Sequence, residues 1–199
     1  MRFIETIKIE NGRIVNLDLH TERAYNTVYH HFQIKRLFDF ESLIPKEITY
    51  NEGIYKLRII YSSDIETFSI TPYEPRSVKS LKVVDGSMIE YGFKYEDRHA
   101  LESLRAQRGE CDEILIVKNG FITDTSYSNI LFSDGERIFT PTTFILNGTK
   151  RRELLLSGLI HEKVMRIEDI HLYRTCWMIN AMLDISCTPP IPCNNIIIP

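Results

Sequence analysis

The first forty residues show two successive hydrophobic periods. Apolar side chains lead up to an Asn11-Gly12 dipeptide and resume directly after it. Because Asn-Gly accepts the positive φ angles of a tight turn, residues 3–14 are predicted to form a β-hairpin. From residue 18 onward, apolar residues recur at steps of three and four as far as Phe32. This spacing predicts an amphipathic helix that ends near Gln33.

The rest of the chain alternates between strand and helix patterns. The strands predicted between residues 113 and 140 are separated by Asn119-Gly120 and Asp134-Gly135, which indicates one antiparallel meander. The chain is therefore expected to be α+β, with two unequal lobes at residues 1–78 and 79–199. The other predicted elements are a short helix at 38–43, strands at 54–61, 67–71 and 81–84, and helices at 97–108, 150–156 and 167–172.

Composition narrows the function classes. The 199 residues include 24 Lys+Arg against 27 Asp+Glu, a net charge of -3, which argues against a nucleic-acid or membrane-surface binder. The four cysteines form no CxxC pair, and His30-His31 has no third ligand nearby, so neither a disulfide scaffold nor a metal site is expected. No apolar run approaches the roughly 18–20 residues of a membrane span, and a cytoplasmic location is expected.

Two residues of the second half are candidates for chemistry, each with a structural alternative. Lys94 follows an aromatic and glycine-containing segment, where partial burial would make its amine nucleophilic; otherwise it is a solvated surface lysine. Asp124 follows a predicted strand and precedes Asn129. Its carboxylate either points into a cleft or bonds its own backbone in a turn.

Two further segments are candidates for anion binding. Gly148 immediately precedes the helix that begins near Thr149 and Lys150, and the backbone N–H groups of a first helical turn bind phosphate well. The chain has neither a P-loop nor a GxGxxG motif, so nucleotide binding is disfavoured. His20 and Arg23 share one side of the first helix, where Arg23 could add a bidentate phosphate contact. The alternatives are an ordinary helix entry and a surface arginine.

These residues carry a family resemblance. In order and spacing, four segments resemble the class IV aminotransferase family of pyridoxal-phosphate enzymes: Asp112–Ile116, Ile122–Phe132, Thr140-Pro141 and Leu146–Arg151. The hairpin and the Leu19-His20-x-x-Arg23 helix resemble the N-terminal lobe of the same family, so the resemblance covers nearly the whole chain. It implies the two-lobed PLP fold type IV, similar to D-amino-acid aminotransferase, with an active site between the lobes, a pyridoxal 5'-phosphate cofactor and a homodimer.

The resemblance also implies a role for each candidate. Lys94 would bond to the cofactor aldehyde and move the substrate α-proton. Asp124 stands where the family has a glutamate facing the pyridine nitrogen, and Asp97 stands where many members have asparagine. Arg58, on a strand of the small lobe, is the candidate clamp for a substrate carboxylate, against a solvent-facing strand arginine. The other implied cofactor contacts are Arg23, Gly148, the amides of Thr149 and Lys150, and the turn at Asn180 and Ala181.

Within this family, the sequence favours a lyase. The chain is short for the family, and a lyase recognises one small-molecule substrate where a transaminase must accommodate two in turn. The expected reaction is the conversion of 4-amino-4-deoxychorismate into pyruvate and 4-aminobenzoate. The alternatives are an aminotransferase acting on branched-chain or D-amino acids, and a non-catalytic homologue that binds the cofactor. The second alternative is favoured if the departures at Asp124 and Asp97 are disabling.

Overall fold

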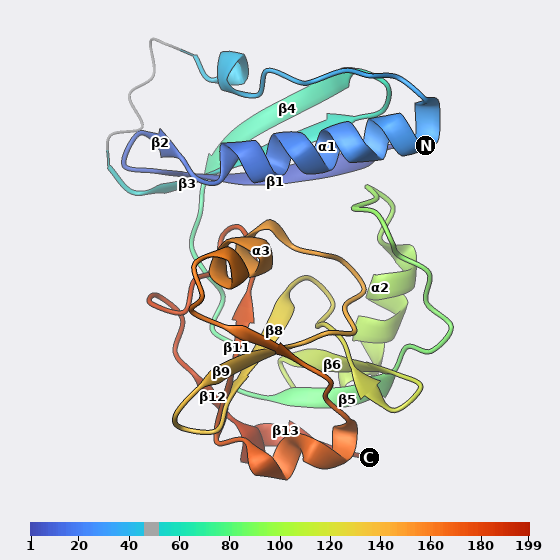
Figure 1. The fold of residues 1–199 in the computed structure, drawn as a ribbon, viewed down its shortest axis with the longest axis vertical. Coiled ribbons are helices and arrows are strands. Elements are labelled where there is room, and N and C mark those ends of the chain that lie inside the picture. The colour runs from blue at the N-terminus through green and yellow to red at the C-terminus, as the bar shows by residue number, and fades with distance from the viewer. Residues whose placement is uncertain (46–51) are drawn as a thin grey trace. The chain divides into compact units, whose positions relative to one another are not determined.

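The chain forms two compact units (Figure 1). The computed structural model describes residues 1–45 and 52–199. Unit 1 contains Met1–Glu74 and Phe93–Asp97, and unit 2 contains Pro75–Gly92 and Arg98–Pro199. This division differs from a boundary at residue 78, because the chain returns to unit 1 for five residues. Their backbone pairs with the start of the chain: Ile4 N–H donates to the Lys94 carbonyl (2.9 Å), and Glu96 N–H donates to the Arg2 carbonyl (3.0 Å).

Unit 1 is an antiparallel sheet with one long helix packed against it (Figure 1). The predicted hairpin and first helix are confirmed, and Asn11 and Gly12 have the expected positive φ angles of 49° and 77°. The helix predicted at 38–43 is wrong in part, since only the single 3-10 turn η1 (Glu41–Leu43) forms. The sheet order is β2-β1-β3-β4. The elements are β1 (Phe3–Glu10), β2 (Arg13–Ile14), α1 (Leu17–Phe32), β3 (Ile54–Tyr61) and β4 (Ile65–Pro72).

Strand alternation places the core of unit 1 under α1. Phe3 and Ile7 of β1 and Leu57 of β3 are fully buried, in one cluster with Ala24 of α1. Because successive side chains of a strand point to opposite faces, Glu5 of β1 lies on this same helix-covered face. A carboxylate is thereby carried into the apolar layer between sheet and helix.

Unit 2 contains two sheets, so the prediction of one meander is wrong. The strands at 113–118 and 121–122 belong to one sheet, and those at 129–133 and 138–141 belong to the other. The physical reason is the turn between Thr125 and Ser128, in which hydrogen bonds of Thr125 to Ser128 replace ladder pairing and redirect the chain. The first sheet has the order β13-β5-β6-β7, with β5 (Leu81–Asp85), β6 (Glu113–Lys118), β7 (Phe121–Ile122) and β13 (Ile196–Ile197).

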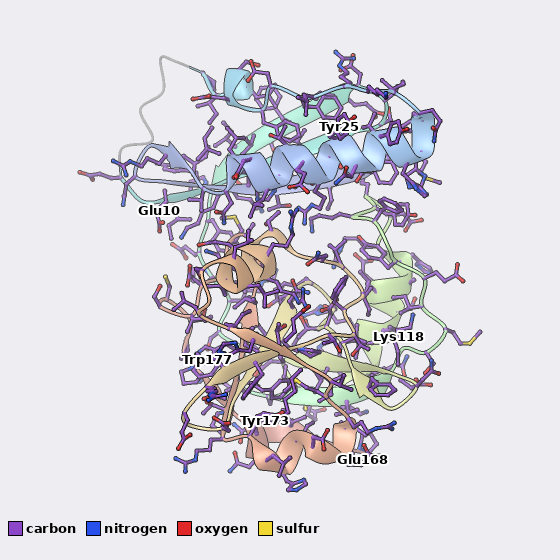
Figure 2. The ribbon with its side chains drawn as sticks, viewed as in Figure 1. Glu10, Tyr25, Lys118, Glu168, Tyr173 and Trp177 are labelled. Carbon is purple, nitrogen blue, oxygen red and sulfur yellow. The ribbon has the colours of Figure 1, made fainter. Side chains whose placement is uncertain are left out.

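The second sheet has the order β10-β9-β8-β11-β12 and carries α3. Leu154 of α3 packs with Leu131 and Ile179 of the sheet, beside the partly buried Trp177 that Figure 2 labels. This contact fixes the helix whose beginning holds several candidate residues. The strands are β8 (Asn129–Ser133), β9 (Ile138–Pro141), β10 (His161–Lys163), β11 (Thr175–Ile179) and β12 (Ile191–Pro192), and the helix is α3 (Thr149–Leu156).

The remaining helical segments of unit 2 are short. Helix α2 (His99–Arg105) continues as the 3-10 turn η2 (Ala106–Arg108) and ends at Gly109, as predicted. The helix predicted at 167–172 is the 3-10 segment η3 (Ile167–Leu172), and η4 (Cys193–Asn195) precedes β13. All four cysteines are free thiols. Among the helices of residues 1–45 and 52–199, none combines the length and apolar character that crossing a membrane requires.

Candidate active site

The strongest polar cluster of unit 1 is a buried ion pair with a histidine. Glu5 is fully buried, and its carboxylate accepts hydrogen bonds from Arg23 Nε (2.8 Å) and Arg23 Nη2 (2.5 Å). His20, also buried, lies with Nδ1 2.6 Å from Glu5 Oε2. Because a carboxylate only accepts, Nδ1 of His20 carries the shared proton. The cluster holds one negative and one positive charge in a bidentate arrangement.

The protonation states of this cluster follow from its charges. Burial alone would raise the pKa of Glu5, but the Arg23 charge and the hydrogen bonds from Arg23 and His20 outweigh it and lower that pKa to about 2. Burial lowers the pKa of His20, and the positive charges of Arg23 and Lys94 add to this effect against the opposing influence of Glu5. Glu5 is therefore ionised and His20 is neutral near pH 7.

Lys94 lies in the same unit as this cluster. Its carbonyl accepts the hydrogen bond from Ile4 N–H, one residue before Glu5 in β1, and its charge is close enough to lower the pKa of His20. The flanking Phe93 and Tyr95 pack against the unit 1 core. Thus the structure brings together Lys94 and Arg23, two residues that the sequence analysis connects only through the family resemblance.

Arg58 does not join this group. Its Cα is paired with that of Thr6, whereas Glu5 is paired with Ile59. Because side chains alternate along a strand, Arg58 lies on the sheet face away from α1, opposite to the face of Glu5. A role as a carboxylate clamp stays a prediction.

Asp124 is a buried acid of unit 2. Its Oδ1 accepts from Asn129 Nδ2 (2.8 Å), and its Oδ2 accepts from the backbone N–H groups of Ile145 (2.8 Å) and Leu146 (3.0 Å). Burial raises its pKa to about 6, against the lowering by these hydrogen bonds and by the charge of Arg151. The carboxylate thus connects, through these hydrogen bonds, the turn after β7 to the segment that leads into α3.

Asn129 also contacts the segment that leads into α3, at Leu146 and Gly148. Asn129 Nδ2 also donates to the Leu146 carbonyl at 2.8 Å. A Cβ on Gly148 would lie only 2.1 Å from Asn129 Oδ1, although the φ of Gly148 is an ordinary -67°. Glycine is therefore required here for close approach and not for backbone conformation.

The first turn of α3 presents backbone donors, as expected for an anion site. The residue before this helix, Gly148, has no side chain that could cap it, and the first N–H groups of a helix have no intrahelical acceptor. The Lys150 side chain does not point to solvent: it is buried, with Nζ 2.8 Å from Asp184 Oδ2 and 2.6 Å from Glu153 Oε2. Burial lowers the pKa of Lys150, but these two carboxylates outweigh it and raise the pKa.

The turn at Asn180 and Ala181 belongs to the same part of unit 2. Asn180 Oδ1 accepts from Met182 N–H (2.8 Å) and Leu183 N–H (3.1 Å), so this side chain builds its own turn. Asp184 follows directly and binds Lys150 of α3. Within unit 2, the structure thus connects the predicted residues at 148–150 and 180–181, while Asp124 is connected to the segment just before Gly148.

The sequence analysis missed Glu5 as a site residue. Its signal was present: Glu5 is the one acidic residue at a position of β1 whose neighbours two residues away, Phe3 and Ile7, are apolar. A charged residue on the buried face of a strand requires a partner of opposite charge, which Arg23 supplies. Arg151, in the first turn of α3, is also buried and binds the Pro141 carbonyl (3.0 Å) and Glu162 (2.5 Å).

Comparison with known proteins defines the family. Residues 94–187 match the family described as amino-transferase class IV. The chain is 38% identical over 181 residues to an uncharacterized protein of Haemophilus influenzae, covering 89% of this chain and 96% of that protein. A crystal structure from Haemophilus somnus, provisionally named a 4-amino-4-deoxychorismate lyase, is 33% identical with a TM-score of 0.85, over 91% of this chain and 96% of that one. The chain belongs to the class IV aminotransferase family.

A more distant structure shows the same fold. A hypothetical aminotransferase from Mycobacterium tuberculosis, in its PLP-bound form, has a TM-score of 0.73 at 15% identity, over 96% of this chain and 80% of that one. The predicted α+β fold type and the family resemblance are both confirmed. The fold and family are those of class IV aminotransferase and lyase-type enzymes.

We predict that Glu5→Gln changes how stability depends on pH. The pKa of Glu5 is about 2 in the folded protein against an ordinary value of 4.5, so the wild type has an extra stabilisation above pH 4.5 that disappears as pH falls toward 2. Over that window the difference in unfolding free energy between wild type and variant should shrink by about 3 kcal/mol. Urea unfolding at several pH values measures it. With the exposed Glu74→Gln as control, a difference for Glu5→Gln that stays constant with pH would contradict the assignment.

Gly148→Ala should destabilise the protein, because the new Cβ meets Asn129, which cannot move without losing its bonds to Asp124 and Leu146. The expected loss is about 1–3 kcal/mol, measured by chemical denaturation. Gly92→Ala is the matched control, since nothing lies within 4 Å of its added Cβ and its φ is not positive. Equal stabilities of the two variants would show that Asn129 adjusts freely.

Proposed function

We propose that the protein is a pyridoxal-phosphate-dependent lyase that converts 4-amino-4-deoxychorismate into pyruvate and 4-aminobenzoate. The observation that carries the proposal is the position of Lys94, the residue at which the family match begins. The Lys94 carbonyl accepts a hydrogen bond from Ile4 N–H of β1, and the next residue of β1 is the buried Glu5 that pairs with Arg23. The likeness to the Haemophilus somnus protein, over 96% of its length, supports a lyase before a transaminase. A homodimeric, cytoplasmic enzyme with a small-molecule substrate is part of the same proposal.

The side chains present fit the proposed cofactor. In unit 1, Lys94 supplies the primary amine that an aldehyde requires, and Arg23 is the candidate guanidinium for a phosphate. In unit 2, the first turn of α3 supplies backbone donors that suit a phosphate. Asp124 supplies a buried carboxyl group for a ring nitrogen. Its pKa is raised to about 6 by burial, and a pyridinium beside it would lower that pKa, because an opposite charge favours the ionised acid.

In the proposed reaction, Lys94 is the residue that moves protons. The bound cofactor supplies an electron sink for the carbon that bears the substrate amine. Lys94 Nζ takes the proton from this ring carbon as enolpyruvate departs and the ring becomes aromatic. Lys94 then delivers the proton to the methylene carbon of the departing enolpyruvate, which becomes pyruvate. One substrate gives two products, so the reaction needs no oxidant and no second substrate.

The first test is chemical labelling. Borohydride treatment of the purified protein with pyridoxal phosphate should fix the cofactor covalently on Lys94, and peptide mapping by mass spectrometry identifies the labelled residue. Lys94→Ala should not be labelled, and its turnover should fall by at least about a thousandfold, because no other group both bonds to the cofactor aldehyde and transfers the proton. Lys56→Ala is the control. A label on Lys56 or Lys82 would overturn the role of Lys94.

The second test separates the activities. Incubation with 4-amino-4-deoxychorismate should release equal amounts of 4-aminobenzoate and pyruvate. The fluorescence of 4-aminobenzoate measures the first product, and a coupled oxidation of NADH measures the pyruvate. The competing assay uses leucine or a D-amino acid with 2-oxoglutarate. Glutamate formation without release of 4-aminobenzoate would replace the lyase by an aminotransferase.

A further inference from the structure

A polar cavity lies within unit 2. It has a volume of about 370 Å³, within the range of small-molecule sites. None of its lining residues is among the candidate residues for cofactor or substrate described above. Its polar lining consists of Arg76, Arg98, Glu102, Arg105, Ser126 and Tyr127.

The cavity has more positive than negative groups. Arg98 Nη2 donates to the Ser126 carbonyl at 2.8 Å, which leaves its charge without a carboxylate, and Arg76 is exposed. Within residues 1–45 and 52–199, neither of these two arginines forms an ion pair. Arg105 is neutralised by Glu113, at 2.8 Å from Nε, and Glu102 is the one acidic residue of the lining.

Ser126 supplies an unused buried hydroxyl. The residue is 2% exposed, and its Oγ has no hydrogen-bond partner in the part of the chain that the structure describes. The neighbouring Thr125 hydroxyl, by contrast, is bonded to Ser128 Oγ at 2.8 Å. A buried hydroxyl without a partner is unfavourable, and a ligand oxygen would satisfy it.

We propose that this cavity binds a small oxyanion, the carboxylate of an organic acid or a phosphate group, through Arg76, Arg98 and Ser126. Guanidinium groups present paired N–H donors that match the two oxygens of such groups, and the serine hydroxyl donates a further hydrogen bond. The excess of positive charge disfavours a cation. Ser126 lies two residues from Asp124, so the ligand would contact the same turn that holds this acid. The proposal stands whether or not the protein is a lyase.

Isothermal titration with potassium phosphate and with sodium malonate, at constant ionic strength in chloride buffer, tests it. Each titration is done on the protein as purified and after incubation with excess pyridoxal phosphate, so that phosphate binding at a cofactor site is recognised. We expect millimolar or tighter binding that persists after this incubation. Tighter binding of malonate identifies an organic acid as the ligand, and tighter binding of phosphate identifies a phosphate compound.

Two variants locate the site. Arg76→Gln and Ser126→Ala should each weaken binding by about tenfold, as expected for loss of a hydrogen bond to a charged group. Ser126→Ala should leave the melting temperature of the ligand-free protein unchanged or higher, because its hydroxyl makes no hydrogen bond among the described residues. The exposed Arg137→Gln and Ser103→Ala are controls. Absence of binding, loss of binding on incubation with the cofactor, or equal affinities in all four variants would overturn the proposal.

Discussion

The charge of Glu5, buried between the sheet and α1, is the interaction on which unit 1 depends. A carboxylate inside an apolar layer is stable only when it is paired and fully hydrogen bonded. Arg23 and His20 meet this requirement, so both are held in one orientation. Removing Arg23 would leave a buried charge uncompensated, and removing His20 would take one hydrogen bond from the carboxylate. The residue that the family resemblance assigns to the phosphate therefore also has a structural role, and a defect in Arg23 affects folding as well as ligand binding.

Glu5 of unit 1 and Asp124 of unit 2 are both buried carboxylates, but their pKa values are shifted in opposite directions. Glu5 is paired with a cation and has its pKa lowered to about 2, whereas Asp124 is held mainly by amide donors and has its pKa raised to about 6. Desolvation raises the pKa of both acids, and the difference is that a guanidinium is hydrogen-bonded directly to Glu5, whereas Arg151 acts on Asp124 only through its charge. Asp124 is thus an acid whose full ionisation calls for a further cation. This asymmetry makes it suited to a ligand that brings a positive charge of its own.

Local pattern predicted most elements but not their long-range pairing. The Asn11-Gly12 hairpin, α1, β3 and α3 each depend on residues that are near neighbours in sequence, and their positions were predicted to within a residue or two. The return of Phe93–Asp97 to unit 1 and the separation of β7 from β8 depend on backbone bonds between distant segments, which periodicity does not encode. For the same reason the motifs could single out Arg23, Lys94 and Asp124 as candidates, whereas the pairing of Glu5 with Arg23 depends on how α1 packs against β1.

The return of Phe93–Asp97 has a consequence for synthesis of the protein. Chains fold from the N-terminus as they leave the ribosome, at roughly 5–20 residues per second. Unit 1 cannot complete its pairing with Arg2 and Ile4 until residue 97 has emerged, although its other segments end at Glu74. During that delay the edge of β1 beside Phe3 lacks its native partner, and an unpaired strand edge is a site of aggregation. The lysine proposed for catalysis lies in the segment that closes this edge.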